Sequence, residues 1–141
     1  METWNFNSLS IGDSIPPLIM EPISRSMLAL YAGASGDHNP IHIDLDFAKG
    51  SGLPDVIAHG MLIMSYVAQA LTNSFPQTMI NNLEVQFCSI TQIKDKLTCS
   101  GKVLNLIHNK KEDSIILALN VINEDGDEML KGTALINMES P

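Results

Sequence analysis

Basic residues are scarce in this chain. Its 141 residues include 8 lysines and arginines, of which Arg25 is the one arginine, against 16 aspartates and glutamates, and the formal net charge is −8. Proteins bind the phosphates of nucleic acids with clustered lysine and arginine side chains. A nucleic-acid partner is therefore not expected.

Cysteines and long apolar runs are scarce as well. Cys88 and Cys99 stand apart, without a CxxC pair or a dense framework, which favours reduced thiols over a disulfide or a metal site. The longest apolar run, residues 61–71, is interrupted by Ser65 and Gln69 and is too short to cross a bilayer. Residues 1–7 lack the basic and apolar regions of a secretory signal. We expect a cytoplasmic protein with no membrane contact.

The rest of the composition is that of a globular domain. Hydrophobic residues make up 45% of the chain and charged residues 17%, which argues against disorder. A chain of 141 residues suits one domain that buries most of its apolar surface. No repeat, linker or low-complexity tract divides it. We predict a single domain over residues 1–141, with its core between residues 8 and 138.

One segment departs from the acidic average. Between residues 86 and 111 the only acid is Asp95, whereas the segment contains five lysines: Lys94, Lys96, Lys102, Lys110 and Lys111. On a shared face these lysines would attract an anionic ligand. On separate strand edges they would be ordinary solvated residues. The sequence leaves both interpretations open.

The first half of the chain predicts one edge strand and three helices. Residues 15–20 contain two prolines, which a sheet tolerates at an edge. Ser24 is a suitable N-cap for a helix over residues 25–34, and a short helical turn is predicted over residues 45–49. Residues 60–74 are apolar almost all round, which predicts a central helix buried on nearly every side.

The second half predicts strands. Alternating apolar residues indicate strands over residues 79–89, 96–106, 114–122 and 128–138. The Asp125-Gly126 turn between the last two is a strong hairpin signal. Antiparallel strands with one apolar helix predict an α+β fold, in which a curved sheet wraps around that helix.

The chemically richest segment lies between the first two predicted helices. It reads GDHNPIH over residues 36–42. The glycine, and the asparagine before proline, disfavour a continued helix, so Asp37 and His42 are predicted to lie on a turn-forming loop. An aspartate near a histidine is a recurring arrangement for proton transfer near neutral pH. Seventeen residues after His42, His59 and Gly60 head the predicted central helix.

These residues resemble a known family. The segment 31–42, with Phe47 and Ala48 after it and AHGML at residues 58–62, is similar to the MaoC-like dehydratases, also called (R)-specific enoyl-CoA hydratases or hydratase 2. Residues 11–13 and 94–103 also look like that family. The resemblance implies the hot-dog fold and the reversible addition of water to a 2-enoyl thioester. It implies substrates of fatty-acid metabolism carried by coenzyme A or acyl carrier protein, and no cofactor.

The resemblance also implies roles for single residues. The residues that match Asp37 and His42 are the family's catalytic pair, and both side chains suit contact with one water molecule. Which of the two takes the proton is not fixed by the sequence. Asn39 would orient the pair through its side-chain amide, and an Asx turn before Pro40 is expected at the same time. Gly60 would form the oxyanion hole, since the first N–H groups of a helix favour negative charge.

Two further residues are candidates for substrate contact. His59 is expected to hold the start of the helix, and Ser35 to shape the loop, with a direct contact to the substrate as the alternative for each. Tyr31 is expected to pack against the core. Asp37, His42 and His59 also invite comparison with a three-ligand metal site. Because Asn-Pro and the glycine after His59 have no use in such a site, no metal is expected.

Two other functions compete with the hydratase. Other hot-dog proteins are thioesterases, but those typically place an acid on the central helix, and residues 61–74 contain none. A non-catalytic acyl-thioester-binding subunit, or one chain of a two-chain dehydratase, is the second alternative, and the intact motif favours a catalytic chain. A hot-dog monomer leaves one sheet edge open, so a homodimer or higher homo-oligomer is expected.

Overall fold

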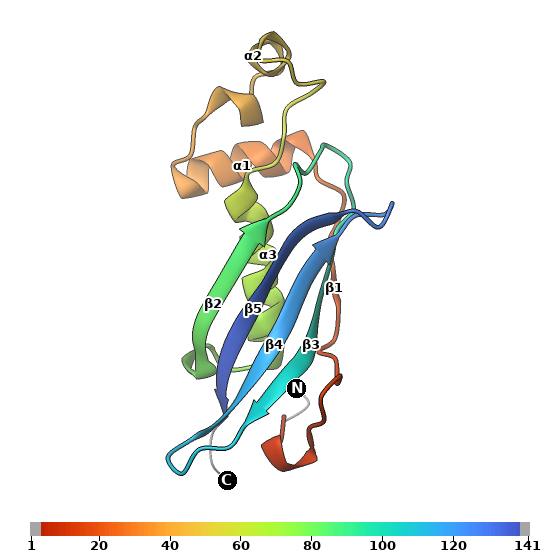
Figure 1. The fold of residues 1–141 in the computed structure, drawn as a ribbon. Helices are drawn as coiled ribbons and strands as arrows, with labels where there is room; N and C mark the ends of the chain where they lie inside the picture. The colour runs from red at the N-terminus through yellow and green to blue at the C-terminus, as the bar shows by residue number, and fades with distance from the viewer. Residues whose placement is uncertain (1–3, 139–141) are drawn as a thin grey trace.

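A computed structural model describes residues 4–138, which form one antiparallel sheet and three α-helices (Figure 1). The strands are β1 (Leu18–Ile19), β2 (Ile80–Phe87), β3 (Thr98–Ile107), β4 (Asp113–Ile122) and β5 (Glu128–Met138), in the spatial order β1-β3-β4-β5-β2. The helices are α1 (Arg25–Ser35), α2 (Leu45–Gly50) and α3 (Gly60–Ser74), and the short 3-10 helices are η1 (Phe6–Ser8), η2 (Pro40–His42) and η3 (Gln77–Met79). The predicted α+β class is confirmed.

The sheet curves around α3. The helix contacts β2, β3 and β4, and Figure 1 shows it lying against one face of the sheet. Val67 of α3, Leu117 of β4 and Ala134 of β5 belong to the same buried cluster. Burial of apolar surface of this kind contributes roughly 25 cal/mol per Å². The contact between helix and sheet therefore stabilises the fold around α3.

One side of α3 is open. Seven of its 15 residues are buried, but Met61, Ser65, Gln69 and Asn73 form an exposed stripe at four-residue spacing. The prediction of burial on nearly every side was wrong. The sheet of one chain covers one side of the helix, and three polar residues in this stripe mark a second face.

Capping and turn residues in the sequence correctly predicted the positions of several elements. Ser24 caps α1 by accepting a hydrogen bond from the N–H of Met27 at 3.2 Å. The predicted edge strand is confirmed at β1, although it is only two residues long. The Asp125-Gly126 turn joins β4 to β5 as predicted, and Gly126 has the positive φ of 82° that such a turn needs.

The lysines between residues 86 and 111 do not form one cluster. Lys94 and Lys96 precede β3, whereas Lys110 and Lys111 follow it. A strand of ten residues spans about 33 Å. The two pairs therefore lie at opposite ends of the strand, which favours ordinary solvated lysines over a single anion-binding face.

The two cysteines differ in their exposure. Cys88 is exposed and Cys99 is buried, and both are free thiols. Burial raises the pKa of the Cys99 thiol to about 12. Within residues 4–138, the structure contains no helix with the length and apolar character needed to cross a membrane.

Candidate active site

The loop that carries Asp37 is shaped by short-range hydrogen bonds. Gly36 ends α1 in the left-handed conformation, with a φ of 75°. The N–H of Asp37 then donates to the Ser35 hydroxyl oxygen at 3.1 Å, and the N–H of Asn39 donates to Oδ1 of Asp37 at 3.2 Å. The structure thus places Ser35 as a loop-shaping residue, and the backbone holds one oxygen of the Asp37 carboxylate.

Asn39 forms the predicted Asx turn, but not the predicted side-chain contact with the catalytic pair. Its side-chain oxygen accepts a hydrogen bond from the N–H of Ile41 at 3.2 Å, an Asx turn that caps η2. Among the described residues, no hydrogen bond joins its side-chain amide to Asp37 or His42. The backbone N–H of Asn39, rather than the amide, contacts the Asp37 carboxylate.

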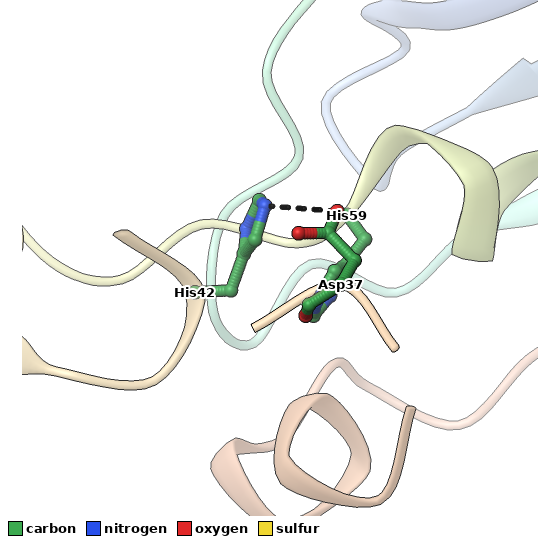
Figure 2. Close-up of side chains that lie close together, drawn as sticks. All are labelled: Asp37, His42 and His59. Atoms are coloured by element: carbon green, nitrogen blue, oxygen red, sulfur yellow. Dashed lines mark hydrogen bonds and ion pairs between the residues drawn. The ribbon is translucent and has the colours of Figure 1, made fainter. Parts of the chain in front are cut away.

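His42 presents a free nitrogen to Asp37. Its Nδ1 lies 2.7 Å from the carbonyl oxygen of Ile57. Because a carbonyl only accepts, Nδ1 carries the proton, and the lone pair of the neutral ring is on Nε2. That Nε2 lies 3.9 Å from Oδ2 of Asp37 (Figure 2). Ile57 could not be predicted as part of the site, since any residue can supply a backbone carbonyl.

The two side chains differ in their exposure. The His42 side chain is 9% exposed, whereas the Asp37 side chain is 52% exposed. The Asp37 carboxylate thus keeps contact with solvent, whereas the His42 ring is largely enclosed. The pair therefore joins a buried imidazole to an accessible carboxylate across a gap of 3.9 Å.

His59 connects the loop to α3. It is 1% exposed, and its Nε2–H donates to the backbone carbonyl of Asp37 at 3.2 Å. Its ring stacks on His42, with centroids 3.8 Å apart and planes inclined by 24°. The Tyr31 ring packs edge-on against His59 at 4.8 Å, in keeping with the packing role predicted for it. His59 occupies the N-cap position of α3 without a side-chain capping bond, so it holds the helix start through packing.

Burial keeps His59 neutral. Desolvation lowers the pKa of its imidazole, while the hydrogen bond to the Asp37 carbonyl acts in the opposite direction. Within residues 4–138, its Nδ1 is buried without a hydrogen-bond partner. Since Nε2 carries the proton, this Nδ1 is the unprotonated nitrogen of the neutral ring.

Gly60 is the first residue of α3. Its N–H therefore belongs to the first helical turn, whose amides have no acceptor within the helix. A Cβ at Gly60 would lie 3.2 Å from Cε1 of Phe87, the last residue of β2. Sequence reasoning missed Phe87, because an aromatic residue at the end of a strand is too common to stand out.

The three polar side chains of the site are close enough to suggest metal binding. One ligand atom from each of Asp37, His42 and His59 lies within 4.8 Å of the others. A metal site needs lone pairs that converge on one point. Stacked imidazole rings direct their lone pairs along nearly parallel planes, and Nε2 of His59 donates to a carbonyl. This arrangement suits proton transfer better than metal binding.

Comparison with known proteins identifies the family. Residues 8–124 match the MaoC like domain. The chain belongs to the MaoC-like dehydratase family. This MaoC-like chain is 32% identical over 108 residues to a protein of Rhodospirillum rubrum named (R)-specific enoyl-CoA hydratase, an alignment that covers 75% of this chain and 74% of the relative.

Solved structures have the same fold as this MaoC-like domain. The unliganded R-hydratase PhaJ1 from Pseudomonas aeruginosa superposes with a TM-score of 0.83 at 25% identity, over 96% of this chain and 86% of that one. The (R)-hydratase from A. caviae involved in PHA biosynthesis has a TM-score of 0.81 at 23% identity, over 94% and 98% of the two chains. The predicted hot-dog fold is confirmed, and so is the resemblance on which it was based.

Proposed function

We propose that the chain is an (R)-specific enoyl-thioester hydratase, which in reverse dehydrates 3-hydroxyacyl thioesters. The observation that carries the proposal is the unprotonated Nε2 of His42 facing Oδ2 of Asp37 at 3.9 Å. Both atoms accept hydrogen bonds, and a single water molecule has two hydrogens to donate. The pair thus suits a water molecule that is to be deprotonated. The relative from Rhodospirillum rubrum carries the name of this activity.

In the proposed reaction, water adds across a carbon–carbon double bond. The oxygen of the water bonds to C3 of the enoyl thioester, and one water proton passes to the Asp37–His42 pair. The pair then delivers one proton to C2, so that the product carries a hydroxyl at C3 and a new hydrogen at C2. The pair ends in its starting protonation state, and the step needs no oxidant or reductant.

Negative charge grows on the thioester oxygen while C3 is attacked. We assign its stabilisation to the N–H of Gly60, at the positive end of the 15-residue helix α3. A preorganised donor of this kind is worth about 10²- to 10³-fold in kcat. Asn39, Ser35 and His59 act as positioning residues, because their contacts reach the Asp37 backbone or carboxylate.

The proposed reaction defines the substrate class, and the carrier of the acyl chain is inferred separately. We infer an acyl chain linked as a thioester to coenzyme A or acyl carrier protein. The separation of Lys94 and Lys96 from Lys110 and Lys111 gives neither carrier an obvious docking patch. Two free thiols support a reducing, cytoplasmic setting.

We also infer that two copies of the chain associate. β2 is an edge strand of the sheet, and the exposed stripe of α3 contains Met61, which is 56% exposed. Unpaired strand edges and exposed apolar side chains are features that a second chain commonly covers. A homodimer would cover both the β2 edge and the exposed stripe of α3.

The first experiment follows the ultraviolet absorbance of the conjugated double bond of crotonyl-CoA. Wild-type protein is expected to remove the band, and Asp37→Asn and His42→Asn are expected to lower kcat by about 10²- to 10⁴-fold. His38→Asn, a change at an exposed histidine of the same loop, serves as the control and should leave the rate unchanged. Full activity in Asp37→Asn would contradict the proposal. Release of free CoA, detected with a thiol reagent, would indicate a thioesterase instead.

A further inference from the structure

Three exposed apolar side chains gather near the start of α3. Met61, Phe87 and Ile90 are 56%, 48% and 52% exposed. The segment after β2 runs beside the residues that precede α3, since the N–H of Ala58 donates to the carbonyl of Thr91 at 2.9 Å. An apolar surface therefore borders the helix terminus at which the thioester oxygen is proposed to bind.

Phe87 makes the closest contact in this group. Its ring atoms Cε1, Cδ1 and Cζ lie 3.2, 3.4 and 3.5 Å from the position that a Cβ of Gly60 would occupy. Phe87 ends β2 and pairs with Leu130 of β5. The ring thus extends from the sheet to the first turn of α3 and fills the space beside the missing side chain. The absence of a side chain at Gly60 leaves room for the Phe87 ring.

We propose that Phe87 is a positioning residue for the hydration step, whose ring packs against the first turn of α3 and thereby fixes the N–H of Gly60. The proposal rests on the proposed function, in which that N–H stabilises the thioester oxygen. A donor that is held in place stabilises growing charge without having to reorganise during the reaction. Because this charge develops in the transition state, the ring affects kcat more than KM.

Single substitutions separate this role from ordinary packing. Phe87→Ala is expected to lower kcat for crotonyl-CoA hydration at least about tenfold and to change KM less than about threefold. Phe87→Leu, which keeps an apolar side chain, should recover most of the rate. Leu104→Ala removes a side chain of similar exposure, 52%, on β3, and should leave kcat unchanged. Equal rates in Phe87→Ala and Leu104→Ala would overturn the proposal, and so would a rise in KM alone.

A double variant tests the contact itself. The methyl group that Gly60→Ala adds meets the Phe87 ring, so Gly60→Ala alone should displace the ring and lower kcat. In combination with Phe87→Ala the methyl group occupies vacated space, and the loss should be smaller than the product of the two single losses. Losses that multiply would overturn the proposal. An inactive wild type would instead overturn the proposed function, which keeps the two failures apart.

Discussion

Two backbone carbonyls decide the protonation of the site. The carbonyl of Ile57 holds the proton of His42 on Nδ1, and the carbonyl of Asp37 holds that of His59 on Nε2. The two stacked imidazoles therefore occupy opposite tautomers. His42 keeps its lone pair toward the carboxylate of Asp37, while His59 keeps its own in the protein interior. One ring is arranged for proton transfer and the other for support.

The neutral state of His59 predicts a dependence of stability on pH. Burial lowers its pKa below the ordinary value of 6.5, so below about pH 6.5 the unfolded chain binds more protons than the folded chain. The stability from this group is complete above that pH and is lost as the pH falls toward the folded-state pKa. His59→Gln retains an N–H donor for the Asp37 carbonyl and does not titrate. We expect its Tm to fall less than that of wild type between about pH 7.5 and pH 5.

Thermal unfolding of both proteins at several pH values checks this prediction. The comparison is made between the two curves, because all other titrating groups are common to both proteins. Parallel curves would contradict a contribution from His59.

The sequence predicted side chains of the site better than backbone groups. Asp37, His42 and Gly60 could be found because turn-forming residues surround the first two and an apolar helix follows the third. Ile57 could not be identified from the sequence, since it contributes a backbone carbonyl oxygen, which every residue has. Phe87 could not be identified either, because its contact with Gly60 depends on how β2 and α3 are placed relative to each other.

Strands β2 and β5 approach each other closely where β5 has a glycine. Gly132 of β5 lies opposite Val85 of β2. A Cβ at Gly132 would overlap the backbone carbonyl oxygen of Glu84, and a backbone atom of a paired strand has little room to yield. By contrast, Gly33 on α1 has open space where a Cβ would be placed.

These two glycines predict opposite effects of the same substitution. Gly132→Ala is expected to destabilise the protein by roughly 1–3 kcal/mol or more, as overpacking does. Gly33→Ala is expected to stabilise it by up to about 1 kcal/mol, since alanine is the better helix former. Chemical denaturation of both variants measures the free energies of unfolding. A neutral Gly132→Ala would show that β2 and β5 pair less tightly than described.

The elements themselves were largely predictable, and the exceptions have physical causes. Capping by Ser24 and the Asp125-Gly126 turn act within a few residues, so their effects could be predicted from sequence. The exposure of one side of α3 could not be predicted from the sequence, because it depends on how far the sheet reaches around the helix. Apolar composition indicated a buried helix without indicating which side was covered.

The molecule as a whole has its candidate active site at one end. Figure 1 shows α1 beside the start of α3, with α2 on the far side of α1, and both helices lie beyond one end of the strands. β2 is an edge strand, and its last residue, Phe87, contacts Gly60 at the start of α3. Association through that edge would bring a second chain close to the site.

The solution mass tests the association. We expect about twice the chain mass of 15.4 kDa at micromolar concentration, because the open β2 edge and the exposed stripe of α3 favour a second chain. Light scattering after size-exclusion chromatography gives the mass independently of shape. A mass that stays at one chain when the concentration is raised would contradict the homodimer.

The position of the one tryptophan has a practical consequence. Trp4 packs against Phe75, with ring centroids 5.2 Å apart, and Phe75 directly follows the last residue of α3. Gly60 lies at the other end of that helix, about 22 Å away at 1.5 Å per residue. Tryptophan fluorescence therefore monitors the packing of the remote end of α3 and is insensitive to events at Asp37 and His42. Unfolding and turnover can be recorded on one sample through separate optical signals.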